Sequence, residues 1–288
     1  MRYILLVCVA VLSFTSPLTS ATSPQHIGDY TVVKTLGSGD QASVYLAQDS
    51  NQNQYAIKVF YTPSEMQKVH PERKSTLASF FNEDGSSKAA SDEYSVGKKL
   101  NHPNIMKLYN ISDEITPDGE RHAYISMQYI KGKNLAKTKA ASLSKHEALS
   151  AMTALLNSLR HAFSKGLIHA DLWDENLYID ENNELKIIDL GSFDPLPVVR
   201  KGEKSRGRYK TYFKVIKSVL ERLIVLGDFS RDEQKELRSL IETAGQNSKN
   251  CQITLETSRQ AQANLLDLEN QLEECMKTFA LSASSTTS

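Results

Sequence analysis

Two short segments that combine apolar strand residues with polar ones constrain the fold of this chain more than any other feature. The first, residues 167–177, carries Asp171 and Asn176 five positions apart, and the second, residues 185–191, carries Asp189. If both segments are short strands, these polar side chains can converge on one point. Asn176 and Asp189 then offer the hard oxygen ligands that suit Mg²⁺ bound to nucleotide phosphates. Asp171 remains able to accept a proton from a hydroxyl group.

The hydrophobic pattern changes from strand-like to helix-like about halfway along the chain. Strands are predicted over residues 31–36, 43–47, 54–61, 105–111 and 123–129, with a helix over 92–100 and an exposed insertion before it. Beyond Gly132 apolar residues recur at helical spacing. Ser144 and Glu147 form a capping box at the start of a helix that Gly166 ends. The sequence therefore predicts an α+β fold of two lobes, one β-rich and one helical and reduced, with a cleft between them.

A turn containing two glycines, Gly37-Ser38-Gly39, lies between the first two predicted strands and leads into Val44. Glycine lets backbone N–H groups approach a phosphate without a Cβ in the way. A plain β-turn has the same pattern, so this turn alone decides little. The next apolar strand contains Lys58, whose ammonium can neutralise phosphate oxygens if it faces the cleft, although a lysine in a strand ordinarily points to solvent.

Lys58 needs an acidic partner, because a flexible ammonium positions nothing by itself. Glu93 and Asp92 both lie at the start of the predicted helix. Helical spacing from Val96 and Leu100 places Glu93 on the buried side of this helix. We therefore expect Glu93, rather than Asp92, to pair with the lysine.

Residues 30–226 resemble the protein kinase superfamily, whose motifs occur here in the family's order. The resemblance rests on the glycine turn, the strand lysine, the helix glutamate, the catalytic loop His169/Asp171/Asn176, and Asp189-Leu190-Gly191 in place of the family's Asp-Phe-Gly. It implies ATP and Mg²⁺ as cofactors, and Asn176 and Asp189 as metal ligands. The catalytic residues that it implies are Asp171, Lys58, Glu93 and His169. The nucleotide-binding residues that it implies are Gly37, Ser38, Gly39, Val44, Ala56, Lys58, Met127, Gln128 and Ile130, with Met127 behind the adenine and residues 128–130 as the hinge.

The sequence departs from the family's pattern around the catalytic loop. Ala170 replaces the arginine that reads a phosphate on the activation loop, so we expect a kinase that is not switched in that way. Trp173 replaces the lysine of serine/threonine kinases, and no Ala-Pro-Glu sequence follows Gly191. The loop with Trp173 is similar to that of small-molecule kinases, which phosphorylate aminoglycosides or glycated amines. A basic stretch over residues 200–208 can supply positive charge to the γ-phosphate or form a solvated loop.

Three functions therefore remain open. A serine/threonine protein kinase with a protein substrate is favoured by the kinase-like first half and by the short segment 128–168, which leaves little room for the acceptor-binding insertion of small-molecule kinases. A small-molecule phosphotransferase is the alternative, favoured by Ala170 and Trp173. A nucleotide-binding pseudokinase is disfavoured, because the lysine, both aspartates and the asparagine all survive.

The first 21 residues predict a secretory signal peptide, with Arg2, an apolar stretch over residues 3–14 and small residues at 19–21. That stretch is shorter than the roughly 20 residues that span a membrane, so we expect no stable membrane span. The prediction is a secreted protein that reaches an ATP-containing place, either a host cell or a eukaryotic secretory compartment. The chain has 34 basic and 34 acidic residues, and its zero net charge predicts no nucleic-acid partner.

The predicted domain order is a signal peptide (1–21), a kinase-like domain (22–227), a helical extension (228–281) and a disordered tail (282–288). Within the kinase-like domain the lobes span about residues 28–127 and 133–227. The extension carries an apolar stripe at helical spacing, which predicts a helix that docks on the second lobe or binds a partner. Cys251 and Cys275 can pair in an oxidising compartment.

Overall fold

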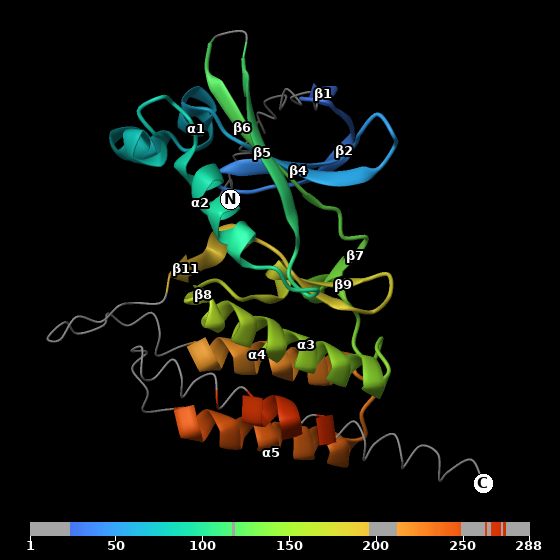
Figure 1. Ribbon diagram of the computed structural model, residues 1–288. Coiled ribbons are helices and arrows are strands. Elements are labelled where there is room, and N and C mark those ends of the chain that lie inside the picture. Colours follow the sequence, from blue (N-terminus) through green and yellow to red (C-terminus); the bar gives the residue numbers. More distant parts are fainter. Residues whose placement is uncertain are drawn as a thin grey trace, which may run out of the picture.

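The computed structural model describes residues 24–116, 119–195, 212–248, 263, 266–271 and 273–274. They form two lobes: a curved sheet flanked by helices and, below it in Figure 1, a stack of helices. Short strands and loops join the lobes between the sheet and the first helix of the stack. The predicted bilobal α+β fold is confirmed.

A six-stranded antiparallel sheet with the order β1-β2-β3-β4-β6-β5 forms the first lobe. Its strands are β1 (His26–Ile27), β2 (Tyr30–Ser38), β3 (Ala42–Gln48), β4 (Gln54–Phe60), β5 (Leu108–Ile115) and β6 (Arg121–Gln128). In the register of β4 with β6, Lys58 lies opposite Ile125 and Ala56 opposite Met127. The sheet therefore brings the strand lysine and the residue expected behind the adenine onto neighbouring strands.

Three helical segments lie between β4 and β5: α1 (Pro63–Val69), the 3₁₀ helix η1 (Pro71–Phe80) and α2 (Lys88–Lys99). The expected insertion is thus largely helical. The predicted start of α2 at residue 92 is wrong by one turn, because Ser87 caps the helix earlier and accepts a hydrogen bond from the Ala90 N–H. The strand expected from Ile105 begins only at β5, because Ile105 instead forms an isolated parallel bridge with Ile187 of the other lobe.

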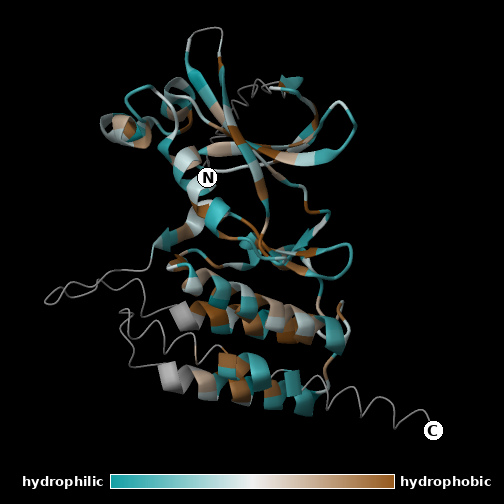
Figure 2. Ribbon diagram, in the orientation of Figure 1, coloured by the Kyte–Doolittle hydropathy of each residue, from teal (hydrophilic) through white to brown (hydrophobic). Residues whose placement is uncertain are grey.

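The second lobe is built around α3 (Lys145–Ser164), which begins at the predicted capping box of Ser144 and Glu147. α3 packs against α4 (Tyr212–Leu226), and α4 packs against α5 (Arg231–Ser248). Hydrophobic residues follow α3 and α4 where the two helices lie together (Figure 2), and Leu156, Leu159 and Leu220 among them are fully buried. Burial of this apolar interface is what holds the helices together.

Five short strands lie between the sheet and the helices: β7 (Gly132–Asn134), β8 (Leu167–His169), β9 (Leu177–Asp180), β10 (Leu185–Ile187) and β11 (Phe193–Pro195). They alternate with the 3₁₀ helices η2 (Leu135–Lys137), η3 (Asp174–Asn176) and η4 (Leu190–Ser192). Strands β10, β9 and β7 form one antiparallel sheet, and β11 pairs with β8. Asp171 follows β8, Asn176 ends η3 and Asp189 follows β10.

A helical segment within residues 263–274 lies against α3. Leu268 is fully buried there, and Glu269 Oε1 accepts a hydrogen bond from Asn157 Nδ2 at 2.9 Å. Glu269 Oε2 lies 3.1 Å from Arg160 Nε of the same helix. These contacts favour the docked alternative for the helical extension, while nothing in the described residues supports a partner there.

Several predictions concern residues outside the described ranges. They are the signal peptide (1–21), the basic stretch (200–208), the pairing of Cys251 with Cys275, and the tail (282–288). All four stay predictions. In the part of the chain that the structure describes, no helix is both long and apolar enough to traverse a lipid bilayer.

Candidate active site

Lys58, Glu93 and Asp189 meet where the two lobes join. Lys58 Nζ lies 2.6 Å from Glu93 Oε2 and 3.5 Å from Asp189 Oδ1. The lysine comes from β4, the glutamate from the buried face of α2, and the aspartate from the loop after β10. Asp92 is exposed, so the partner of the lysine is Glu93, as helical spacing indicated. The ammonium is thereby held at one position by charge-assisted contacts.

Burial and charge act against each other in this cluster. Burial alone would lower the pKa of Lys58, but the carboxylates of Glu93 and Asp189 outweigh it and raise that pKa. Glu93 is 2% exposed, and burial raises its pKa above the ordinary value, so its ionisation depends on the nearby ammonium. The two carboxylates thus favour the charged form of Lys58, which can neutralise an anionic group in the cleft.

The backbone around Asp189 adopts an uncommon conformation that aims its carboxylate. Its φ of 58° and ψ of 67° lie in the left-handed region, which aspartate tolerates better than most residues. Ser192 Oγ donates a hydrogen bond to Asp189 Oδ2 at 2.6 Å, while Oδ1 faces Lys58. Gly191 lets this turn approach α2, because a Cβ there would lie 2.9 Å from Glu93 Oε2.

The catalytic loop brings Asp171 and Asn176 together. Asn176 Nδ2 donates to the Asp171 carbonyl oxygen at 2.8 Å and lies 3.5 Å from Asp171 Oδ2. Since the NH₂ group faces Asp171, the oxygen of the Asn176 amide is the atom left for a metal ion. The Ile188 N–H donates to the Asn176 carbonyl oxygen at 2.9 Å, which places Asn176 beside the residue that precedes Asp189.

Trp173 contacts the same loop in a way that the sequence did not reveal. Its indole N–H donates a hydrogen bond to Asp171 Oδ1, although Trp173 as a whole is 52% exposed. Asp171 is exposed as well, so its carboxylate is accessible to solvent, although Asp171 is not among the residues that line the two cavities described below. The tryptophan thus restricts the orientation of the carboxylate and presents an aromatic surface beside it.

His169 is brought to the loop but not to the surface. It is fully buried, and its ring packs edge-on against Phe193 at 4.6 Å between ring centroids. Burial lowers its pKa, and the neutral ring accepts the Asp171 N–H at Nδ1 (3.3 Å) while Nε2 lies 3.5 Å from the Ile188 carbonyl oxygen. Because the ring is fully buried, it cannot touch a substrate directly, and its contact with this part of the chain is the hydrogen bond from the Asp171 N–H.

A cavity of about 590 Å³ opens between the lobes beside Lys58. Of the nucleotide-binding residues implied by the resemblance, eight line it, namely Gly37, Ser38, Val44, Ala56, Lys58, Met127, Gln128 and Ile130. The sequence did not point to other lining residues, which include Leu36, Met106, Tyr129 and Tyr178. The volume is within the range of small-molecule sites in proteins.

Gly39 is the one expected nucleotide-binding residue that does not line this cavity. Its N–H donates to the Ala42 carbonyl oxygen at 2.8 Å, closing the turn. It lines a second cavity of about 800 Å³, which continues past Lys58 and Asp189 toward α2 and Phe193. The two cavities share Val44, Lys58, Glu93 and Asp189, so the charged cluster stands between them.

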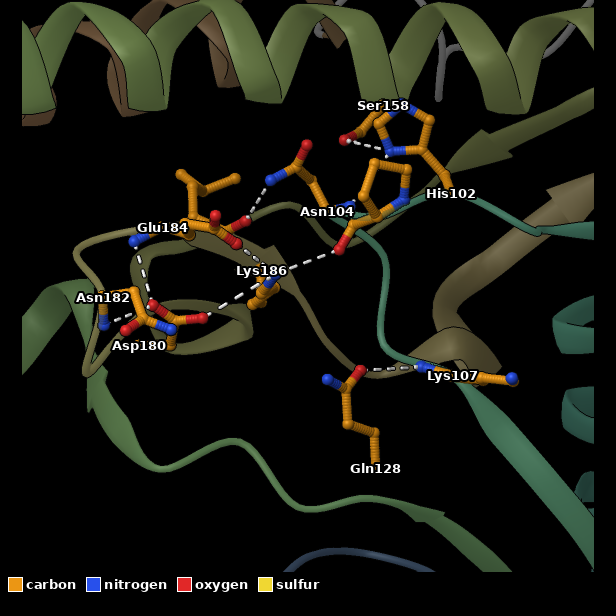
Figure 3. Close-up of polar contacts among 11 residues, drawn as sticks. His102, Asn104, Lys107, Gln128, Ser158, Asp180, Asn182, Glu184 and Lys186 are labelled. Atoms are coloured by element: carbon orange, nitrogen blue, oxygen red, sulfur yellow. Dashed lines mark hydrogen bonds and ion pairs between the residues drawn. The ribbon is translucent and has the colours of Figure 1, made fainter.

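Polar contacts far from the cleft fix the segments that carry these residues (Figure 3). Lys186 of β10 is 7% exposed, and its Nζ donates to the Pro103 carbonyl oxygen at 3.1 Å and to Glu184 Oε2 at 2.7 Å. Asn104 Nδ2 donates to the Leu185 carbonyl oxygen at 2.8 Å. The segment before β5 is thereby tied to the strand that leads to Asp189.

Gln128, the first residue of the expected hinge, is bound to Lys107 in the same segment before β5. The Gln128 N–H donates to the Lys107 carbonyl oxygen at 2.8 Å. The Lys107 N–H lies 3.4 Å from Gln128 Oε1, a contact that Figure 3 shows. The amide N–H of Gln128 is therefore used within the protein.

Arg222 of α4 supports the catalytic loop from below. Its Nη2 donates to the carbonyl oxygens of Leu135 at 3.0 Å and Thr138 at 2.7 Å, and its Nε lies 3.5 Å from Asp174 Oδ2. Sequence reasoning missed this residue, because its partners lie more than 40 positions away. It links the helical stack to the loop that carries Asp171.

The two lobes, the Lys58–Glu93 pair with Asp189 beside it, and the neighbouring loop that holds Asp171 next to Asn176 are together typical of a phosphotransferase. A family model described as "Protein kinase domain" matches residues 30–207. The chain belongs to the protein kinase family. It is similar to serine/threonine-protein kinase SIK2 of Gallus gallus, with 28% identity over 62% of this chain and 20% of the relative. It is also similar to the probable serine/threonine-protein kinase At1g09600 of Arabidopsis thaliana, with 30% identity over 58% of this chain and 21% of the relative.

The chain thus spans about a fifth of the length of these curated relatives. The part matched by the family model begins with β2 and covers the rest of the sheet, the cleft and the catalytic loop.

Proposed function

We propose that this protein transfers the γ-phosphoryl group of Mg-ATP to a serine or threonine hydroxyl of a protein, with Asp171 as the base. The observation that carries the proposal is the Lys58–Glu93 pair at 2.6 Å, which meets Asp189 in the lining of the cavity that Gly37 and Ser38 also line. A fixed cation between a nucleotide-sized cavity and a metal-binding carboxylate suits a triphosphate.

The residues present fit Mg-ATP. The Asn176 amide oxygen and the Asp189 carboxylate are hard oxygen ligands of the kind that Mg²⁺ prefers. When bound, the metal ion neutralises charge on the phosphates. Lys58 would contact phosphate oxygens, the turn at Gly37 would cover them, and Met127 would close the back of the adenine pocket. Asp171 would accept the proton of the attacking hydroxyl group.

A small-molecule phosphotransferase is the second candidate, and one contact favours it. Trp173 both orients Asp171 and exposes its ring where serine/threonine kinases have a lysine. Such a ring can stack on a planar or sugar-like acceptor. The two relatives are both described as serine/threonine kinases, which supports the protein acceptor.

The test is incubation of the purified protein with γ-labelled ATP and Mg²⁺, together with either mixed proteins or a panel of small alcohols and amines. We expect label on serine and threonine residues of protein, and none with the Asp171→Asn variant. Label only on small molecules would establish the second candidate instead. Nucleotide binding without any transfer would identify a pseudokinase.

We also propose that the protein is secreted and acts in an ATP-containing place, such as a host cell. Support comes only from the apolar N-terminal segment and the small residues that follow it. The mass of the protein recovered outside the producing cells should correspond to a chain that begins after Ala21. Recovery of the full-length chain from inside those cells would contradict the proposal.

A further inference from the structure

We propose that the insert, residues 62–87, holds the glycine loop, residues 37–42, in its phosphate-binding position. In this proposal Arg73 of the insert neutralises Asp40 at the tip of the loop, so that the loop can receive the phosphates of a nucleotide. The proposal rests on the nucleotide binding proposed above. Arg73 is a positioning residue in this role, because it acts through Asp40.

Two side chains of the insert reach the tip of the loop. Arg73 Nη2 donates to Asp40 Oδ2 at 3.0 Å, and His70 Nε2 lies 2.9 Å from the Asp40 carbonyl oxygen. The Arg73 N–H in turn donates to the His70 carbonyl oxygen at 3.0 Å, so both groups belong to one turn of chain. The insert therefore contacts both the side chain and the backbone of Asp40.

The insert is itself attached to the sheet, and these contacts fix its position relative to the glycine loop. Thr62 and Glu65 form a capping box at the start of α1. Glu65 Oε2 also lies 2.6 Å from Nε2 of His122 on β6, and Ser64 Oγ donates to Glu120 Oε1 at 2.9 Å. Met66 is 2% exposed. The tip of the glycine loop is therefore connected to β6 through the insert. This strand is not part of the β2–β3 hairpin to which the loop belongs.

The charge of Asp40 explains why a positive group is needed at this point. The hydrogen bond from Arg73 lowers the pKa of Asp40, so the carboxylate is ionised at neutral pH. Asp40 lines the cavity that Lys58 and Asp189 also line, next to the expected place of the phosphates. A carboxylate there repels an anionic phosphate unless a cation accompanies it. An exposed ion pair is worth little to stability, so the effect belongs to nucleotide binding rather than to folding.

The test is a double-mutant cycle on nucleotide affinity, measured by isothermal titration of Mg-ATP into the full chain. Arg73→Ala should raise the Kd about three- to fivefold, the size of a lost exposed charge pair. In a protein that already carries Asp40→Asn, the same substitution should change the Kd by less than about twofold. Lys74→Ala is the matched control, because Lys74 is the exposed residue that follows Arg73 and its replacement removes the same charge. Its Kd should equal that of the wild type.

A second measurement reads the restraint without any nucleotide. Amide hydrogen exchange of residues 36–44 should be faster in Arg73→Ala than in the wild type or in Lys74→Ala. Unchanged exchange, an unchanged Kd, or equal effects of Arg73→Ala with and without Asp40→Asn would each overturn the proposal. If the wild type fails to bind Mg-ATP, the proposed function fails, and the exchange rates still decide whether the insert restrains the loop.

Discussion

Asp171→Asn is expected to slow phosphotransfer by about 10²–10⁴-fold, the range that removal of a general base costs. The amide keeps the shape of the side chain and can still accept the indole N–H of Trp173 and lie beside Asn176. It cannot take up the proton of an acceptor hydroxyl. The loss should therefore appear in kcat, with the Kd for Mg-ATP unchanged.

Single-turnover rates and nucleotide titrations on the same preparations separate these two effects. Asp228→Asn is the matched control, because Asp228 is an exposed aspartate of the same lobe. Its rate should match the wild type. A rate in Asp171→Asn within about threefold of the wild type would assign proton acceptance to another group.

Most of the cleft could be predicted from the sequence, because its residues stand at the ends of short apolar segments. The spacing of Asp171, Asn176 and Asp189 within such segments predicts that their side chains lie near one another, even if the predicted strand ends are wrong by a residue or two. The choice of Glu93 over Asp92 followed from helical periodicity, although the helix begins a turn earlier than expected. These inferences use only local pattern, which survives small errors in element boundaries.

The contacts that hold the cleft could not be predicted, because they join segments far apart in the sequence. Arg222 reaches Leu135, and Lys186 reaches Pro103, without any periodic signal that would pair them. The burial of His169 depends on the pairing of β8 with β11, which the sequence analysis did not predict. One missed signal was present locally: Ser87 is a good N-cap residue, and it marks the true start of α2.

The contacts of the insert could not be predicted from the sequence either. Polar composition indicated an exposed insertion, yet composition does not tell which surface such a segment covers. Its two helices place His70 and Arg73 at Asp40, about thirty positions earlier in the chain. The functional interpretation of this segment therefore arises only from the tertiary structure.

Asp189→Asn is expected to abolish the Mg-dependent stabilisation of the protein by ATP. Mg-ATP at about one hundred times its Kd contributes about 2.7 kcal/mol to the wild type. For a domain of this size that corresponds to a rise in Tm of roughly 5–10 °C. Asparagine is the chosen replacement because it tolerates the left-handed backbone at this position and can still accept the hydrogen bond from Ser192. The Tm of the variant without nucleotide should therefore stay close to that of the wild type.

The metal accounts for this loss only if its removal has the same effect. Wild-type protein with ATP and a chelator should lose most of the shift, since the negative phosphates then face Asp189 with no cation between them. Scanning calorimetry of both proteins, with and without Mg²⁺, gives the four values that decide the question. If Asp189→Asn shows the full Mg-dependent rise in Tm, the metal is held elsewhere. The contact of Asp189 with Lys58 would then be its main role, because that ion pair at 3.5 Å fixes the lysine with or without a metal ion.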